Sequence, residues 1–341
     1  MDKKHIGSWC WAGALSSVLS QSAYGLSFQI ADLGSLVGNS YSVPHTLSGN
    51  GLATGYSYNG TAARAFYWSN RTGMRDIGAL GDSASYGYGI NDRGHIVGYS
   101  KVGSADHAFF WSKSTGIFDL GSLGGANSHA REVNGNAQVV GYSQLGSGKY
   151  RAFLWSAKSG MQNLGALNEL GNSYATGINE LGQVTGFSLA ASHMHAFLWH
   201  MATGMQDLGS LGGSSSYGKA INNAGQVVGY SAMGAAEHAF LWSPDSGMRD
   251  LGTLGGANSY AKGINDAGVV VGQSDTVAGP RAFVWAAAMG MQDVTPLLVN
   301  ANDWVVEGGV SVNQVGEILA LGRNAQGKYH ALLLLPDEAY P

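Results

Sequence analysis

The 341-residue sequence has few of the residues that cross-link, stiffen or charge a chain: one cysteine, six prolines and 12% Asp, Glu, Lys and Arg. A single cysteine, Cys10, excludes a disulfide within the chain, so packing alone must supply stability. The net charge of −4 excludes phosphate neutralisation as a basis for binding, so we expect no nucleic-acid partner. Because 45% of the residues are hydrophobic, the composition favours a folded chain over a disordered one.

Long hydrophobic runs are also missing, and no segment beyond the N-terminus is long enough for a transmembrane helix. Two lysines precede an apolar run over residues 9–19, and small residues up to Ala23 offer a cleavage site. We expect residues 1–23 to be a secretory signal peptide and residues 24–341 to be a single domain. The protein would then be secreted, to the periplasm or the exterior, without membrane insertion.

Glycine is abundant, with 53 residues, and the chain consists of seven copies of one unit of about 43 residues. A basic residue followed by Ala-Phe-x-Trp marks the unit. This motif begins at Arg64, His107, Arg151, His195, His238 and Arg281, and a degraded seventh copy of the motif begins at His330. The last unit is longer than the others, which indicates an insertion around residues 298–305.

Each unit contains four short segments typical of β-strands, separated by turns that contain glycine. Four short strands in a unit of this length predict a propeller blade. The seventh unit ends after its third strand, and residues 28–34 match the missing fourth one. We therefore predict an all-β, seven-bladed β-propeller of four-stranded blades, closed by residues 28–34. A parallel β-solenoid is the alternative, and it would require capping segments at both ends.

The His-Ala-Phe tripeptide starts at residues 107, 195 and 238, and Asp-Leu-Gly-x-Leu-Gly-Gly and Val-Val-Gly-Tyr-Ser segments recur with it. In these motifs the chain resembles the HAF-repeat family of predicted extracellular proteins, over residues 28 to about 335. The resemblance implies a secreted repeat protein. It carries over no catalytic residue, because the function of the family is undefined.

The basic residue before Ala-Phe suggests a metal or proton-transfer site, but histidine and arginine alternate at this position. Arginine has no free lone pair and cannot replace a histidine as a metal ligand. In six units an Asp or Asn follows 12 residues later, across the turn between the third and fourth strands. Residues equidistant from such a turn face each other, so we predict a structural basic–acidic pair in each blade. His330 should pair with Asp32 of the closing strand.

Catalytic signatures are missing as well: there is no Gly-x-Ser-x-Gly elbow, no His-Glu-x-x-His pair and no phosphate-binding loop. The acidic residues in the turns do not alternate as the ligands of a calcium loop do. We therefore assign no catalytic residue, and we predict no metal site and no cofactor.

The first strand of each unit should line the central channel, with its second, fourth and sixth residues on one face. The second and fourth positions vary although the scaffold around them is constant. The second position holds Val43, Tyr86, His129, Tyr174, Tyr217, Tyr260 and Gly308. The fourth position holds His45, Tyr88, Arg131, Thr176, Lys219, Lys262 and Val310.

Tyrosine rings stack on sugars, and arginine and lysine bind carboxylates or sulfates. The candidate ligand-binding residues are therefore His45, Tyr86, Tyr88, His129, Arg131, Tyr174, Tyr217, Lys219, Tyr260 and Lys262.

Three functions remain open. The first is a secreted module that binds polysaccharide or another surface ligand at the funnel mouth. The second is a lyase or hydrolase acting on an acidic polysaccharide, with His45, Tyr88, His129 and Arg131 in one asymmetric pocket. The third is a protein-interaction scaffold that uses exposed loops. The structural alternative to all three is that the polar channel residues only meet water and that the tyrosines pack against the next blade.

Overall fold

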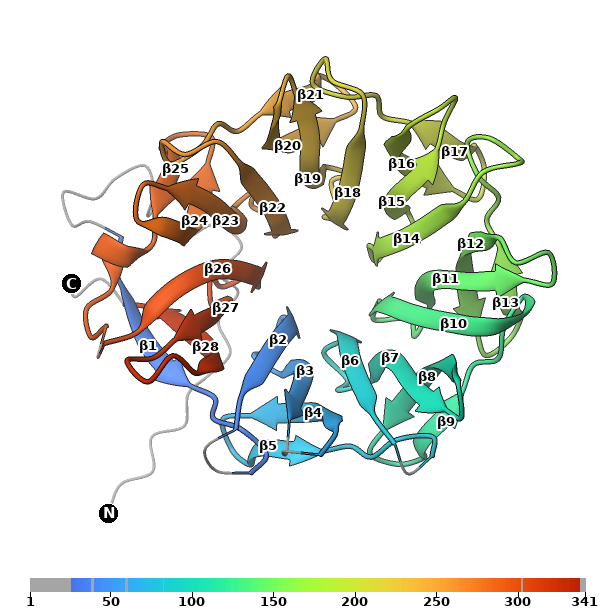
Figure 1. The fold of residues 1–341 in the computed structure, drawn as a ribbon, viewed down its shortest axis with the longest axis horizontal. Coiled ribbons are helices and arrows are strands. Elements are labelled where there is room, and N and C mark those ends of the chain that lie inside the picture. The colour runs from blue at the N-terminus through green and yellow to red at the C-terminus, as the bar shows by residue number, and fades with distance from the viewer. Residues whose placement is uncertain (1–25, 38–39, 59–60, 82, 302, 338–341) are drawn as a thin grey trace.

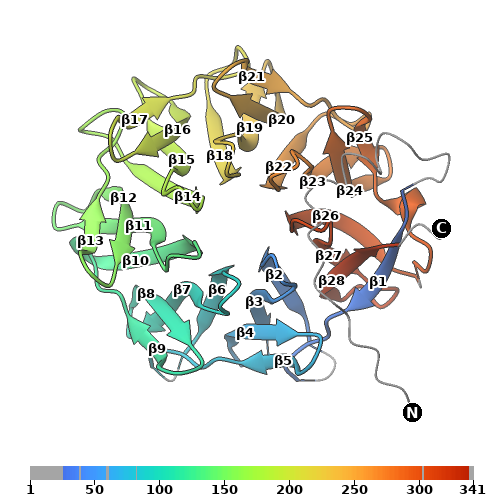
Figure 2. The ribbon, with the colours of Figure 1, turned by 180° about the vertical axis from the view of Figure 1, so that it is seen from behind.

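The computed structural model describes residues 26–37, 40–58, 61–81, 83–301 and 303–337. These residues form 28 β-strands and one short 3-10 helix, in seven four-stranded antiparallel sheets around a central axis (Figures 1 and 2). The prediction of an all-β, seven-bladed propeller is confirmed. The predicted signal peptide lies outside the described residues. Within them, no helix has the length and apolar character needed to cross a membrane.

The blades are numbered along the chain, and in each the first strand lies nearest the axis. The strands, from the axis outward, are β2 (Ser42–Leu47), β3 (Ala53–Tyr58), β4 (Ala63–Ser69) and β5 (Gly73–Asp76) in blade one; β6 (Ser85–Ile90), β7 (Ile96–Val102), β8 (Ala105–Ser112) and β9 (Gly116–Asp119) in blade two; β10 (Gly124–Val133), β11 (Val139–Leu145), β12 (Tyr150–Ser156) and β13 (Gly160–Asn163) in blade three; β14 (Ser173–Ile178), β15 (Val184–Leu189), β16 (Met194–His200) and β17 (Gly204–Asp207) in blade four; β18 (Ser216–Ile221), β19 (Val227–Met233), β20 (Ala236–Ser243) and β21 (Gly247–Asp250) in blade five; β22 (Ser259–Ile264), β23 (Val270–Thr276), β24 (Gly279–Ala286) and β25 (Gly290–Asp293) in blade six; and β26 (Val305–Val312), β27 (Ile318–Arg323), β28 (Tyr329–Pro336) and β1 (Phe28–Asp32) in blade seven.

Ring closure follows the prediction, because β1 pairs antiparallel with β28 and supplies the fourth strand of blade seven (Figure 1). The 3-10 helix η1 (Thr295–Leu297) directly precedes the predicted insertion at residues 298–305, and the first residues of this insertion contact β1. Leu298 forms a parallel bridge with Phe28, and the Val299 N–H donates to the Phe28 carbonyl at 3.0 Å. The chain therefore holds its own N-terminal strand between β28 and this segment.

The hydrophobic core lies between neighbouring blades. The phenylalanine of each Ala-Phe-x-Trp motif is fully buried, as Phe109 shows in a cluster with Ala65, Ile90 and Ile96 from blades one and two. Three motif tryptophans also enter these clusters, namely Trp68, Trp242 and Trp285. Large aromatic side chains stabilise such contacts because each buries much apolar surface.

Polar side chains also join the blades. The Ser85 hydroxyl accepts from the Ala65 N–H at 3.0 Å and donates to the Gly78 carbonyl at 2.6 Å, which ties β6 to blade one. Asn91 begins a turn, and its side-chain amide also donates to the Asn134 carbonyl in the next blade at 2.9 Å. The same bond continues from Asn134 through Asn179, Asn222 and Asn265 to Asn313.

The predicted basic–acidic pairs form in five blades. Their nitrogen–oxygen distances are 2.6 Å for His107–Asp119, 2.9 Å for His195–Asp207, His238–Asp250 and His330–Asp32, and 3.9 Å for Arg64–Asp76. The expected strand register is wrong, however, because Asp76 lies opposite Phe66 and reaches Arg64 diagonally. The aspartate also stabilises the following turn, where the Gly78 N–H donates to Asp76 at 2.7 Å.

The remaining two blades contradict the prediction of a pair in every blade. In blade three the residue 12 positions after Arg151 is Asn163, which carries no charge, and Arg151 donates instead to the carbonyls of Glu169 and Gly171. Arg281 donates to the Pro280 carbonyl at 2.9 Å and forms no ion pair with any described carboxylate. An arginine side chain is long enough to reach loop carbonyls that an imidazole cannot reach.

Candidate functional site

A β-bulge in every inner strand positions the variable channel residues. In blade two, Gly87 pairs with Gly98 and Gly89 with Val97, so Tyr88 has no partner in the ladder. Bulges re-aim side chains and interrupt pairing. The bulged residues are His45, Tyr88, Arg131, Thr176, Lys219, Lys262 and Val310, the complete fourth position of the sequence repeat.

The bulge also corrects one expectation. The alternation of the strand predicted that the isoleucine at the sixth position would share the channel face. An extra residue reverses the faces that the following residues occupy. Ile90 is consequently only 3% exposed, in the core cluster that contains Phe109.

Tyrosines at the second position form part of a continuous aromatic belt around the channel mouth. Tyr86 stacks on Tyr99 of the second strand at 4.7 Å between ring centroids and meets Tyr56 of blade one edge-on at 5.0 Å. Neighbouring members lie 4.5–5.1 Å apart throughout. The aromatic belt consists of Tyr56, Tyr86, Tyr99, His129, Tyr142, Tyr174, Phe187, Tyr217, Tyr230 and Tyr260.

The sequence analysis did not predict the half of the belt that comes from the second strands. The recurring tyrosine of the Val-Val-Gly-Tyr-Ser segment could have indicated these residues. The first-strand tyrosines of the belt pack against rings of their own blade and of the preceding blade, not the next one, and each of them remains partly exposed. The belt ends at blade seven, where Gly308 and Leu321 occupy the two positions. The channel mouth is therefore asymmetric, with a non-aromatic sector at the closing blade.

Three cations from the bulge positions lie next to the belt. The Arg131 guanidinium lies 4.0 Å from the Tyr88 ring centroid and donates to the Tyr142 hydroxyl at 2.8 Å. The Lys262 amine donates to the Gln273 side chain at 3.2 Å. None of the ion pairs among the described residues involves Arg131, Lys219 or Lys262. We call these three residues the cation group.

Burial and mutual repulsion act on the cation group. Burial lowers the pKa of Lys219 to about 8, and the charges of Arg131 and Lys262 act in the same direction. Burial also lowers the pKa of Lys262. Taking an ammonium out of water near other cations disfavours its charged form, so an anion that enters the channel would relieve this cost.

The two candidate histidines are neutral at neutral pH. Burial lowers the pKa of His45 to about 3, helped by the charges of Arg131 and Lys262. Burial lowers the pKa of His129 to about 4, against the opposing effect of the Asp106 carboxylate 3.6 Å away. The Nε2 of His45 and the Nδ1 of His129 are enclosed and have no hydrogen-bond partner among the described residues. Enclosed nitrogens cannot take a proton directly from a bound substrate in this conformation.

Glu132 follows the bulged Arg131 and was not among the candidate residues. Its carboxyl group accepts from the Val133 N–H at 3.0 Å and lies 3.4 Å from the Thr46 hydroxyl. Burial raises its pKa to about 8, so it is mostly protonated at neutral pH. Glu132 therefore leaves the charge of the cation group uncompensated. Nowhere in the described part of the chain do three His, Cys, Asp or Glu side chains gather in a way that could hold a metal ion.

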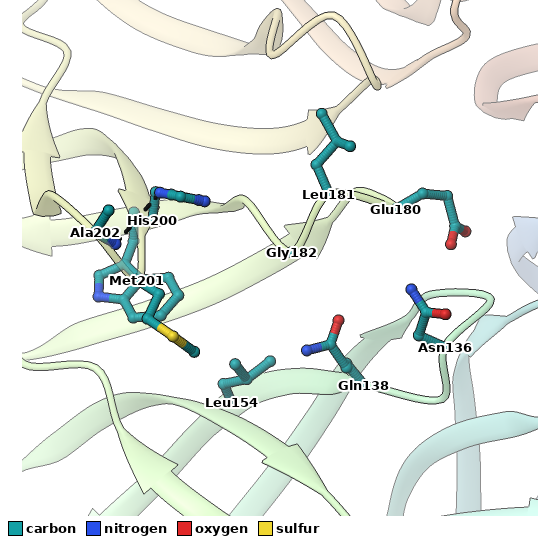
Figure 3. Close-up of a pocket in the computed structure, with 10 residues that line it drawn as sticks. Asn136, Gln138, Leu154, Glu180, Leu181, Gly182, His200, Met201 and Ala202 are labelled. Atoms are coloured by element: carbon teal, nitrogen blue, oxygen red, sulfur yellow. Dashed lines mark hydrogen bonds between the residues drawn. The ribbon is translucent and has the colours of Figure 1, made fainter.

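A separate cavity of about 420 Å³ lies between blades three and four (Figure 3). Turn residues line it, so it lies at the opposite end of the inner strands from Tyr174. Leu181 and Met201 at its edge are 66% and 75% exposed. No candidate residue lines this cavity. A departure from the repeat could have pointed to it, because His200 stands at the start of the outer turn of blade four, where most blades have a serine.

No protein-family model matches the chain, and no curated protein matches it. Solved structures do: an oligogalacturonate lyase in complex with manganese has a TM-score of 0.58 at 13% identity, covering 92% of this chain and 97% of that one. The β-propeller domain of the Trilobed protease from Pyrococcus furiosus, which has an open velcro topology, has a TM-score of 0.57 at 10% identity, covering 89% and 99%.

A TolB from Agrobacterium tumefaciens has a TM-score of 0.51 at 12% identity, covering 80% of this chain and 97% of that one. The chain spans only about half, 54%, of the TolB from Acinetobacter baumannii that it also matches. At these identities the similarity establishes the propeller fold alone.

Proposed function

We propose that the protein is a secreted binding module that holds an acidic polysaccharide, or another acidic surface ligand, at the mouth of the central channel. The observation that supports this is the cation group, whose members pair with no described carboxylate. A concave site lined by one sign of charge concentrates ligands of the opposite sign. Arginine and lysine then bind carboxylates or sulfates through charge-assisted hydrogen bonds.

The aromatic belt would contact the sugar rings of such a ligand. Tyr86, Tyr174 and Tyr217 already stack on second-strand rings at 4.7–4.9 Å. We therefore expect their exposed edges and hydroxyl groups, rather than free ring faces, to meet the ligand. Tyrosine suits this role because it combines an apolar body with a polar tip.

A lyase or hydrolase acting on an acidic polysaccharide is the alternative, and one similar fold belongs to an oligogalacturonate lyase. Such an enzyme needs a base within reach of the proton that it removes. The Nε2 of His45 and the Nδ1 of His129 are enclosed, and burial lowers the pKa of both imidazoles, so both are weak bases. For this reason we favour binding without turnover.

Secretion and family membership are part of the proposal. Residues 1–23 have the pattern of a signal peptide, which would deliver the mature chain to the periplasm or the exterior. The His-Ala-Phe repeats support membership of the HAF-repeat family.

A calorimetric titration of the mature protein with acidic and neutral oligosaccharides of equal length tests the binding. We expect binding of the acidic series only, weakened about tenfold or more in the Lys219→Gln/Lys262→Gln variant, since two charged hydrogen bonds are lost. The matched control is Lys113→Gln/Lys158→Gln, which removes the same charge from exposed turns.

Equal weakening in both variants would indicate a non-specific charge effect and would overturn the channel site. Shortened products in the titrated mixture would favour the lyase or hydrolase. If the folded wild-type protein binds no acidic oligosaccharide, the protein-interaction scaffold becomes the better proposal. Its exposed hairpin tips at Val102, Met233 and Val277 would then be the surface to examine.

A further inference from the structure

Lys219 differs from the other members of the cation group in its hydrogen bonding. The Arg131 guanidinium donates to Tyr142, and the Lys262 amine donates to Gln273. The Lys219 amine has no hydrogen bond to any described residue, and it lies 5.3 Å from the Tyr230 ring centroid and 5.7 Å from that of Phe187. Its ammonium form therefore has aromatic neighbours and no acceptor.

The position of Lys219 also lowers the affinity of its amine for a proton. As the bulged residue of β18 it is turned out of the strand ladder, yet it remains only partly exposed. Arg131 and Lys262 act on it as like charges, and with burial they lower its pKa to about 8. A lysine that is desolvated and close to other cations is the kind that serves as an amine nucleophile in proteins.

We propose that Lys219 captures a small carbonyl acid, an aldehyde or ketone that carries a carboxylate, as a reversible imine. The carboxylate would be attracted by Arg131 and Lys262, the two cations whose charges act on Lys219. This site shares the cation group with the polysaccharide proposal, but a small acid needs neither the aromatic belt nor a polymer.

The covalent step balances without a redox partner. The neutral Lys219 amine donates its lone pair to the carbonyl carbon, and the carbonyl π electrons move to oxygen. Proton transfer from nitrogen to oxygen gives the carbinolamine. Loss of water then forms the C=N bond, and hydrolysis reverses each step. The ammonium proton that Lys219 gives up beforehand passes to solvent water.

Reductive trapping of the imine tests the proposal. The full protein is incubated with glyoxylate and cyanoborohydride at about pH 7.5, and peptide mass spectrometry locates the carboxymethyl group. A pKa near 8 leaves much more neutral amine at this pH than ordinary lysines have, so we expect Lys219 to be modified at least about tenfold faster than Lys158. Acetaldehyde has no carboxylate, so its selectivity for Lys219 should be smaller and should come from the lowered pKa of the amine alone.

Two variants complete the test. Lys219→Arg keeps the charge and should remove the fast-reacting site, while circular dichroism verifies the fold. Arg131→Gln should slow the glyoxylate reaction more than the acetaldehyde reaction, because the acetaldehyde reaction loses only the effect of Arg131 on the pKa of Lys219. Modification of Lys219 no faster than of Lys158, or equal rates with both aldehydes, would overturn the proposal, whatever the oligosaccharide titration shows.

Discussion

Blade two and blade seven solve one packing problem in two ways. In blade two, Gly98 lies opposite Phe109 across the second and third strands. In blade seven the same two positions hold Ala320 and Leu332, again opposite each other and both fully buried. The glycine and the phenylalanine are therefore one packing unit, because the chain replaces both together.

The physical reason is that the backbone of β6 and the Phe109 ring leave no space for a Cβ atom at this glycine. A Cβ at Gly98 would overlap the Tyr86 carbonyl oxygen and lie 3.0 Å from the edge of the Phe109 ring. The same overlap with a first-strand carbonyl recurs at Gly55, Gly141, Gly186, Gly229 and Gly272. In blade seven, β26 has two bulges instead of one at this junction, which changes the register of its carbonyls. Together with the smaller Leu332, this leaves room for the alanine Cβ.

The largest effect that this comparison predicts is that of Gly98→Ala. We expect a loss of at least about 3 kcal/mol of unfolding free energy, because backbone and ring must both move in a close-packed core. Chemical denaturation monitored by circular dichroism measures it. The counterpart Ala320→Gly should cost about 1 kcal/mol, the usual backbone entropy term plus one lost methyl group. Equal costs for the two substitutions would refute the coupling between glycine and phenylalanine.

Blade seven also differs from another blade, blade three, in the inner strand that lines the channel. The residue directly after the bulge is Glu132 in blade three and Ser311 in blade seven. The pKa of Glu132 is raised to about 8 in the folded state, above its unfolded value. The unfolded state therefore loses this proton first as pH rises, and the stabilising contribution of the protonated carboxyl falls between about pH 4.5 and 8.

Glu132→Gln should remove this pH dependence. The variant is expected to be more stable than the wild type at about pH 9, by about 2–3 kcal/mol, and to differ little at about pH 5. Denaturation curves at the two pH values measure the difference. Ser311→Ala in blade seven is the control, since a serine that only accepts from the Leu47 N–H has no proton to lose in this range. Parallel curves for wild type and Glu132→Gln would contradict the buried, protonated state.

Sequence reasoning recovered the fold because the period, the turn glycines and the split last blade are local signals. It placed the candidate residues at the channel for the same reason. It also predicted three cations at the channel mouth, but it could not foresee that Arg131, Lys219 and Lys262 are bulged residues, because strand alternation does not reveal bulges. It did not make Glu132 a candidate residue, because the neutrality of this carboxyl group depends on its burial in the folded structure. The cross-blade bonds of the turn asparagines depend on spatial neighbours in the same way.

Those asparagines give the smallest predicted effect. The Asn222 amide donates to the Asn265 carbonyl of the next blade at 3.1 Å, whereas the Asn313 amide donates at 2.7 Å to Glu317 within blade seven. Asn222→Ala leaves a buried carbonyl of a neighbouring blade without its donor, so we expect it to cost about 1 kcal/mol more than Asn313→Ala. Thermal and chemical denaturation of both variants measure this difference. If Asn313→Ala costs as much as Asn222→Ala, the bonds stabilise each turn separately and contribute nothing to the joining of the blades.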